Sequence, residues 1–240
     1  MHRVLAALLG ALLFGPLAAH AGFLIVDENG EQVLLSTGRL KMAPRSAGGL
    51  VLMLDVGRGR LWVADPGRRR YWEGTVDEYC EGVRGLAAAS TPDAEKSSGG
   101  SSRTPQVTIE RTPDTATIAG LPTRKVRVLA DGTLYEELWL ASDPALLGEL
   151  IVARAPDTFG RMTGCLSTAG RGRGVEATEE FRRLYSEGWP LKVVFHGDGS
   201  AVPVTAVARL ERRDIPEGEF TRPAGFAAVS LPEVFGRAAP

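Results

Sequence analysis

Residues 125–141 read KVRVLADGTLYEELWLA and predict two antiparallel strands joined by a tight turn. Asp131-Gly132 is a strong two-residue hairpin signal, because both positions of such a turn accept a positive φ. In the second strand, even-numbered side chains are expected on one face and odd-numbered side chains on the other. The two sets are Leu134, Glu136, Leu138 and Leu140 against Tyr135, Glu137 and Trp139.

The same alternation of short apolar runs and turn residues extends on both sides of this hairpin. Asn29-Gly30 gives a second hairpin signal, and Asp65-Pro66-Gly67 predicts another turn. Further strands are predicted over residues 23–26, 32–35, 40–42, 50–56, 60–64, 107–109, 117–118, 191–195, 202–210 and 220–226. The chain is therefore expected to be rich in β-structure, with neighbouring strands following one another along the sequence.

Helical patterns interrupt the strands at three places. Over residues 75–89 the apolar side chains recur every three or four positions, and Thr75 with Glu78 has the spacing of a capping box. Two further helices are predicted, one from Asp143 to around Arg154 and one over residues 177–185.

The composition is that of a globular protein. The chain has 240 residues, of which 44% are hydrophobic and 24% are charged, and its 29 Gly and 15 Pro indicate many turns. The formal net charge is −1, so no general electrostatic field attracts nucleic acid, and no nucleic-acid partner is expected.

Residues 1–21 are predicted to be a secretory signal peptide. Arg3 supplies a positive start, an apolar run follows, and Ala19-His20-Ala21 is a small-x-small cleavage site, so cleavage is expected after Ala21. The alternative is a membrane anchor, but the apolar run is too short to span about 30 Å of hydrocarbon. The mature protein is expected to be exported to the periplasm and not to span the membrane.

Cys80 and Cys165 are the two cysteines of the chain. An even pair in an exported protein favours a disulfide, whereas two separate buried thiols remain the alternative. Signal cleavage would also remove His2 and His20, which leaves His196 as the single histidine. No metal site and no cofactor are expected from this inventory.

Residues 90–105 read STPDAEKSSGGSSRTP, a polar stretch that is expected to form a mobile loop. It either divides two domains or is an insertion within one sheet. The insertion is preferred, because neither side alone shows a complete helix-covered core. Residues 22–236 are therefore expected to form a single domain.

Four short motifs occur in an order that resembles uncharacterised exported proteins of the periplasmic lipoprotein-carrier-like family. They are Ile118-Ala119-Gly120, Leu138-Trp139-Leu140-Ala141, Gly188-Trp189-Pro190-Leu191 and Phe220-Thr221-Arg222-Pro223-Ala224-Gly225-Phe226. The resemblance implies an α+β fold that is mostly antiparallel β. In it a curved half-barrel sheet carries helices packed on its concave side, together with a hydrophobic cavity or groove.

That resemblance favours a non-enzymatic binding role. The expected ligand is apolar or lipid-like, such as a lipid, lipoprotein acyl chains or an envelope lipoprotein segment. Aromatic residues on predicted strands are the candidate cavity residues, with ordinary core packing as the alternative. They are Trp62, Trp72, Tyr135, Trp139 and Phe195. A second hypothesis is an envelope interaction or regulatory scaffold that binds a protein partner without a small ligand.

No catalytic residue is assigned from the sequence. His196 lies close to Asp198 at a strand end, but the chain has no Gly-x-Ser-x-Gly elbow to supply a nucleophile. Two arginine-rich stretches, Arg68-Arg69-Arg70 and residues 170–174, are expected to be solvated surface rather than anion sites. A hydrolase of an unrecognised type is the least favoured hypothesis.

Overall fold

The structure of the protein is a computed structural model that describes residues 19–46, 48–90, 104–149, 158, 160–162, 165, 174–196 and 200–236. Most of the predicted signal peptide, residues 1–18, and most of the predicted loop, residues 91–103, lie outside these residues. The first described strand begins at Ala19, so cleavage after Ala21 would remove the start of that strand.

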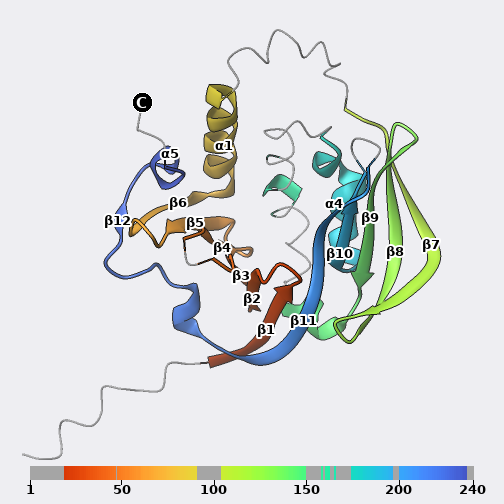
Figure 1. Ribbon diagram of the computed structural model, residues 1–240, viewed down its shortest axis with the longest axis horizontal. Coiled ribbons are helices and arrows are strands. Elements are labelled where there is room, and N and C mark those ends of the chain that lie inside the picture. Colours follow the sequence, from red (N-terminus) through yellow and green to blue (C-terminus); the bar gives the residue numbers. More distant parts are fainter. Residues whose placement is uncertain are drawn as a thin grey trace, which may run out of the picture.

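Within the described residues, twelve strands form one open, curved sheet (Figure 1). One arm contains β1 (Ala19–Asp27), β2 (Gln32–Ser36), β3 (Arg39–Ala43), β4 (Val51–Asp55), β5 (Arg60–Asp65), β6 (Arg70–Thr75) and β12 (Ala227–Ala228). The other arm contains β7 (Val107–Ile118), β8 (Leu121–Ala130), β9 (Thr133–Ala141) and β10 (Trp189–Phe195). The spatial order is β12-β6-β5-β4-β3-β2-β1-β11-β10-β9-β8-β7, and all neighbours are antiparallel except β12 and β6.

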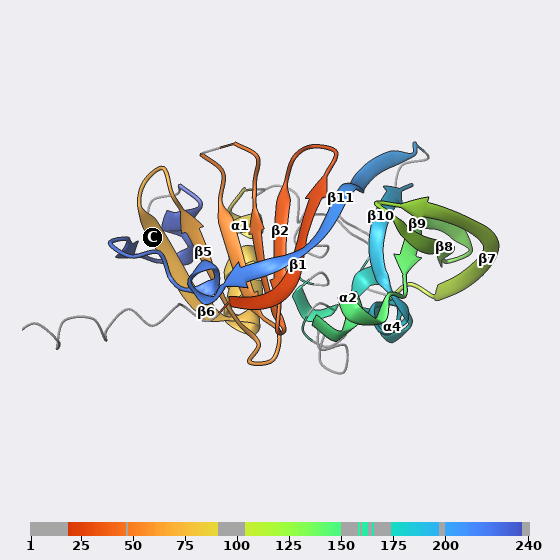
Figure 2. The same cartoon turned by 90° about the horizontal axis from the view of Figure 1, so that it is seen from below.

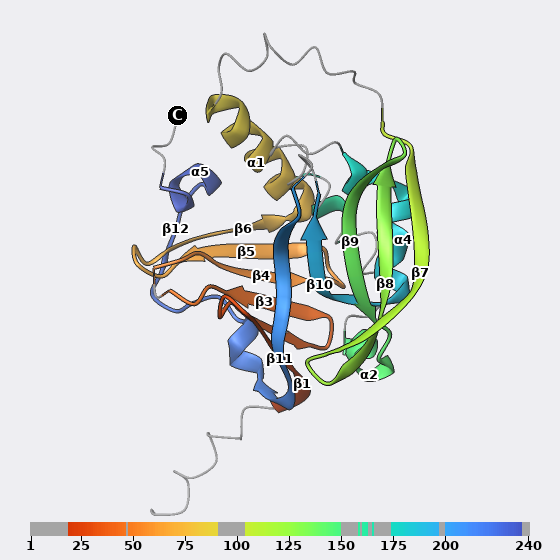
Figure 3. The same ribbon diagram turned by 45° about the vertical axis from the view of Figure 1, so that its right-hand side comes forward.

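Strand β11 (Val202–Pro216) joins the two arms. Its first part pairs with β10, as in the pair Lys192 and Ala206, and the rest pairs with β1 from Val207 to Pro216. Figure 2 shows β11 passing from the second arm to the first, and Figure 3 shows that the strands of the two arms run in markedly different directions. The curvature of the sheet is therefore concentrated where β11 changes partner.

The helices are α1 (Val76–Ser90), α2 (Pro144–Glu149), α4 (Glu179–Glu187) and α5 (Leu231–Val234), with short 3₁₀ helices η2 (Val175–Ala177) and η3 (Glu217–Phe220). Helices α1 and α4 lie between the two arms, on the concave side of the sheet (Figure 1). The predicted α+β class, with a curved and mostly antiparallel sheet, is confirmed.

The predicted capping box starts α1. The Glu78 carboxylate accepts from the Thr75 backbone N–H at 2.6 Å, and the Thr75 hydroxyl accepts from the Glu78 N–H at 3.2 Å. These bonds satisfy donors that the first turn of a helix leaves without partners. The apolar stripe that follows, including Val76 and Tyr79, is buried against the first arm.

The described residues form two apolar cores, and the larger one also includes Ala141 of β9 and Leu191 of β10 from the second arm. The larger core joins β1–β5 to α1 and α5, with Leu35 and Leu54 completely buried at its centre. The smaller core joins β8–β10 to η2 and α4 through Phe181 and Leu184. Thr178 caps α4 by accepting from the Phe181 N–H, which aims this apolar face of α4 at the sheet.

The strict alternation predicted for residues 134–141 is wrong at one position. Tyr135 is buried in the same core as Leu138 and Leu140 rather than facing the other side. The reason is a β-bulge: Leu134 pairs with Leu129 and Glu136 pairs with Val128, so Tyr135 is an extra residue that shifts the alternation.

The ends of several elements also differ from the prediction. Residues 107–118 form one strand, with an irregular stretch between Arg111 and Thr115 that contains Pro113. Residues 220–226 do not form the predicted strand. Instead, Glu217 and Glu219 bind Arg39 and Lys41 of β3, so η3 lies on the face of the sheet.

No helix among the residues that the structure describes is long and apolar enough to cross a membrane.

Two glycines of α1 test how closely α1 packs against α5. A Cβ at Gly82 would lie 2.5 Å from Leu231 Cδ2, whereas a Cβ at Gly85 would meet nothing within 4 Å. Gly85→Ala should raise the free energy of unfolding by about 0.5–1 kcal/mol, because Ala is the better helix former. Gly82→Ala should lose that gain, because the added methyl group clashes with Leu231. The free energy of unfolding of this variant should be at least about 1 kcal/mol below that of Gly85→Ala.

Urea unfolding of the two variants measures this difference directly. Equal stabilisation by both substitutions would show that α5 is not seated against α1 at Gly82.

Candidate functional site

The disulfide Cys80–Cys165 links α1 to Cys165, which follows the described residues 160–162, and the Cα atoms of the two cysteines are 5.3 Å apart. Both residues are buried in the larger core, and the predicted bridge is confirmed. The two cysteines are 85 positions apart in the sequence. Closing a loop of that length restricts the unfolded chain by about 4–5 kcal/mol in the chain-entropy model.

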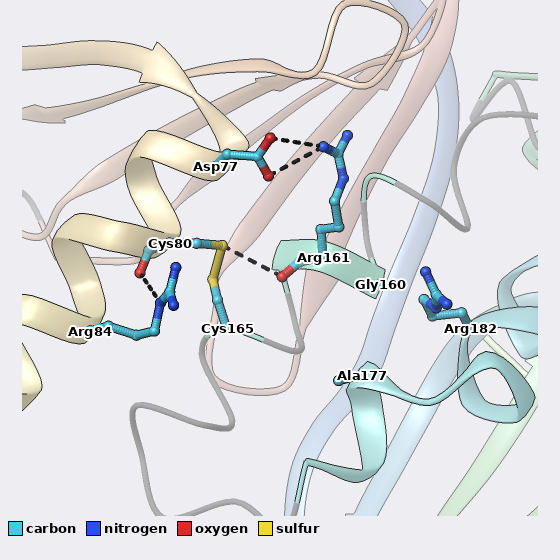
Figure 4. A pocket seen from close by; sticks show the side chains of 8 residues that line it. All are labelled: Asp77, Cys80, Arg84, Gly160, Arg161, Cys165, Ala177 and Arg182. Carbon is cyan, nitrogen blue, oxygen red and sulfur yellow. Dashed lines mark hydrogen bonds and ion pairs between the residues drawn. A yellow bond between two sulfur atoms is a disulfide. The ribbon is translucent and has the colours of Figure 1, made fainter. Parts of the chain in front are cut away.

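A cleft of about 320 Å³ opens beside this disulfide. Helix α1 forms one wall, residues 160–162 and Cys165 lie in the middle, and η2 with α4 forms the opposite wall (Figure 4). The lining residues are Asp77, Cys80, Arg84, Gly160, Arg161, Cys165, Ala177 and Arg182. The cleft thus lies on the concave side of the sheet, where elements of the two arms meet.

Among the described residues that line the cleft, three are arginines and one is an aspartate, which is an excess of positive charge. Arg161 Nη1 lies 3.1–3.2 Å from both carboxylate oxygens of Asp77. Arg84 donates from Nε to the carbonyl of Cys80 at 3.2 Å. The Nε of Arg182 is buried and has no hydrogen-bond partner among the described residues.

Gly160 allows Arg182 to enter the cleft. A Cβ at Gly160 would lie 2.1 Å from Cδ of Arg182, so the aliphatic part of the arginine lies directly against the glycine backbone. Larger residues at position 160 would displace it. Sequence reasoning missed this site because its arginines are far apart in the chain and form no motif, and the cysteine pair was the one available signal.

The five predicted cavity residues lie at separate places, and none of them lines the cleft. Tyr135 and Phe195 are brought together as an edge-to-face pair with ring centroids 5.0 Å apart. Trp72 is half-buried 6.1 Å from the ring of Tyr79. Their role as cavity residues stays a prediction.

The two remaining tryptophans occupy different surroundings. Trp62 is 4% exposed but points away from the core that contains its neighbours Leu61 and Val63. Trp139 is half-buried between Lys125 and Lys192, whose ammonium groups lie 5.0 and 4.9 Å from its ring.

His196 lies beside Glu137 on the face of the sheet opposite Glu136. Its Nε2 is 3.4 Å from Glu137 Oε2 without hydrogen-bond geometry, and Asp198 lies outside the described residues. Partial burial acts to raise the pKa of the Glu137 carboxyl, but Lys125 at 2.6 Å and His196 outweigh it and hold the pKa below its usual value. The arrangement is an ion-pair cluster on a sheet face.

The predicted basic surface at Arg68-Arg69-Arg70 has local partners. Arg68 binds Asp65 at 2.8 Å, and Arg69 donates to the carbonyl of Gly225. Residues 170–173 of the second arginine-rich stretch lie outside the described residues. Among the described residues, no group of three or more His, Cys, Asp or Glu side chains could hold a metal ion.

Two carboxyl groups meet inside the smaller core. Glu136 is 9% exposed, and Glu176 accepts a hydrogen bond of 2.6 Å from the Tyr135 hydroxyl. The Oε2 atoms of both glutamates are buried without a partner among the described residues. Burial, together with the negative charge of Glu176, raises the pKa of Glu136 to about 8, so Glu136 is mostly protonated at neutral pH.

Comparisons with known proteins give distant structural similarity. No family model matches the chain. No curated protein matches it. The chain is similar to the solved structure of PNGF-II, with a TM-score of 0.37 and 10% identity over 88% of this chain and 31% of that one. It is also similar to the crystal structure of MucB, with a TM-score of 0.29 and 14% identity over 88% of this chain and 59% of that one. The chain therefore spans less than two thirds of the length of either protein.

Replacement of both cysteines should destabilise the fold while leaving it assembled. We expect Cys80→Ala/Cys165→Ala to lower the free energy of unfolding by about 2–5 kcal/mol, because the unfolded chain gains freedom. Denaturant unfolding measures this loss, and the reduced wild-type protein is the control that should show a similar loss. A large loss in the variant with none on reduction would trace the effect to packing instead.

Glu136 should make the protein less stable in alkaline solution. Its pKa is raised in the folded state, so its stabilising contribution is complete below about pH 4.5 and is lost as pH rises towards 8. Glu136→Gln keeps a neutral group there. The stability of this variant relative to wild type should therefore rise by about 3–5 kcal/mol between pH 5 and pH 9.

Glu137→Gln is the matched control, because the pKa of Glu137 is lowered and its carboxyl does not titrate in that range. The prediction is tested by measuring the free energy of unfolding of wild type and of both variants at pH 5 and at pH 9. A parallel pH dependence for Glu136→Gln and wild type would show that Glu136 is already ionised in the folded protein.

Proposed function

We propose that the protein is a non-enzymatic, exported binding protein that takes a lipid-like ligand in the cleft beside the disulfide. The observation that carries this proposal is the cleft itself, about 320 Å³ between α1 and the wall of η2 and α4. That volume is at the lower end of the range of about 300–1,000 Å³ found for ligand pockets. It suits one end of an elongated molecule.

Two further features support the proposal. The disulfide Cys80–Cys165 is of the kind that persists in oxidising compartments, which agrees with the predicted export to the periplasm. The cleft lies on the concave side of a curved sheet, the place at which the resemblance to lipoprotein-carrier-like proteins predicts a ligand. Burial of acyl carbons supplies about 0.8 kcal/mol per CH₂, so such binding needs no catalytic motif.

A second candidate function is a scaffold for an envelope protein, and one observation favours it. Val202 and Val204, two positions apart at the start of β11, are 49% and 55% exposed. Exposed apolar side chains close together are typical of contact surfaces. In this case Val202→Thr/Val204→Thr should abolish capture of a protein partner and leave lipid binding unchanged.

Displacement of a fluorescent fatty acid from the full chain tests the lipid proposal, with native mass spectrometry to detect a co-purified ligand. Ala177→Trp should weaken fatty-acid binding at least tenfold, because Ala177 lines the cleft and the larger ring fills it. Ala208→Trp, at an exposed position of β11, is the matched control and should bind normally.

The proposal fails if the wild-type protein carries no ligand and binds no fatty acid. It fails equally if Ala177→Trp and Ala208→Trp bind as tightly as wild type, since binding would then lie outside the cleft.

A further inference from the structure

We infer that the Cys80–Cys165 disulfide is a site of thiol–disulfide exchange in the folded protein, and that the cleft admits the dithiol that reduces it. Exchange at the disulfide does not depend on which ligand the cleft takes, so it goes beyond the proposed function. A small dithiol and a pair of cysteines on another protein share this chemistry, and the experiment below separates them.

The disulfide has one side in the core and one side in the cleft. Cys80 and Cys165 are 6% and 8% exposed and belong to the larger core, and both also line the cleft. Figure 4 shows their sulfur atoms between α1 and residues 160–162. The cleft has a volume of about 320 Å³, whereas one molecule of liquid water takes up about 30 Å³. A thiol group on an aliphatic chain therefore fits into it.

The charges at the cleft favour attack by a thiolate. Among its described lining residues, three are arginines and one is an aspartate, although the whole chain has a net charge of −1. The thiolate, and not the thiol, is the nucleophile in exchange. Local positive charge raises the concentration of such an anion at the disulfide.

Arg84 favours Cys80 as the leaving sulfur. Arg84 lies one helical turn after Cys80, and its Nε donates to the carbonyl of Cys80 at 3.2 Å. A guanidinium group this close stabilises a thiolate, and a stabilised leaving group speeds exchange. The incoming thiolate therefore attacks Sγ of Cys165, and the electron pair of the S–S bond goes to Sγ of Cys80.

The second thiol of the reductant completes the reaction. As a thiolate, it attacks the reductant's own sulfur in the mixed disulfide, and Cys165 leaves as a thiolate. The reductant is thereby oxidised to a disulfide, and the protein disulfide is reduced to two thiols. Two electrons and the two thiol protons pass from the reductant to the protein.

The fold offers an acceptor to each thiol that reduction produces. Sγ of Cys80 lies 3.5 Å from the carbonyl oxygen of Arg161, and Sγ of Cys165 lies 3.1 Å from the carbonyl oxygen of Met162. A thiol is a weak donor, so both can be satisfied where the sulfur atoms already lie.

Other contacts hold the segment beside the disulfide when the S–S bond is broken. The Thr158 hydroxyl donates to the carbonyl of Val56 at 3.2 Å, Met162 is buried in the larger core, and Arg161 lies 3.1 Å from Asp77. Reduction should therefore loosen one wall of the cleft and leave the protein folded.

The experiment follows reduction of the full oxidised chain by dithiothreitol, with alkylation and mass spectrometry to count the free thiols. The rate should rise in proportion to the dithiothreitol concentration and stay nearly constant in urea below the unfolding transition. Exchange that required global unfolding would speed up with urea as steeply as the unfolded fraction rises. That result, or no reduction of the folded protein, overturns the inference.

Filling the cleft tests the route of the reductant. Ala177→Trp should slow reduction at least about fivefold, because the larger ring occupies the cleft and exchange depends on access to the sulfur atoms. Ala208→Trp, at an exposed position of β11, is the matched control and should react as wild type does. A variant that folds poorly would be reduced faster, so slower reduction does not arise from misfolding.

Removing the charge beside Cys80 tests the leaving sulfur. Arg84→Gln should slow reduction about threefold, because the Cys80 thiolate loses its neighbouring charge. Arg183→Gln is the matched control, since Arg183 is exposed and paired with Glu179, and it should not change the rate. Equal rates for Arg84→Gln and wild type would overturn the assignment of Cys80 as the leaving sulfur.

Thioredoxin is the probe for a dithiol carried by a protein. Faster reduction per dithiol by thioredoxin than by dithiothreitol identifies cysteines on another protein as the reductant, whereas slower or absent reduction by thioredoxin identifies a small dithiol. Either result supports exchange at the cleft. Equal rates for wild type, Ala177→Trp and Ala208→Trp place the reaction outside the cleft and overturn the inference, while fatty-acid binding by the oxidised protein would leave the proposed function standing.

Discussion

The Cys80–Cys165 disulfide is the constraint on which the candidate site depends. It attaches the segment that contains Gly160 and Arg161 to α1, and α1 is fixed to the first arm by its capping box and apolar stripe. The opposite wall is fixed independently by the core that seats α4 on the second arm. Three supported elements therefore form the cleft, and the disulfide sets the distance between two of them.

The polar groups near the cores have different partners in the two arms. In the first arm they are mostly paired with neighbours at the surface, as Arg39 is with Glu217. In the second arm Glu136 and Glu176 lie against the apolar core, with Tyr135 as their shared neighbour. A proton on Glu136 is what allows two carboxyl groups to occupy this place at neutral pH.

The sequence predicted those features that local physical chemistry determines. Alternation and turn residues were sufficient for the hairpins at Asn29-Gly30 and Asp131-Gly132, and the cysteine count was sufficient for the disulfide. The bulge at Tyr135 could not be predicted, because a two-residue period contains no information about where a strand gains an extra residue. The cleft could not be predicted for a related reason: Arg84, Arg161 and Arg182 come to line one cleft through tertiary packing alone.

The position of β11 sets the order in which the fold can be completed. Hairpins such as β8–β9 join residues that are close in sequence. The pairing of β1 with β11 joins residues that are far apart in sequence, such as Ile25 and Leu210. Contacts between distant parts of a chain form late, because the entropy of closing the loop opposes them. The amino-terminal strand pairs early with β2 along one edge, whereas its other edge stays without its partner until nearly the whole chain is present.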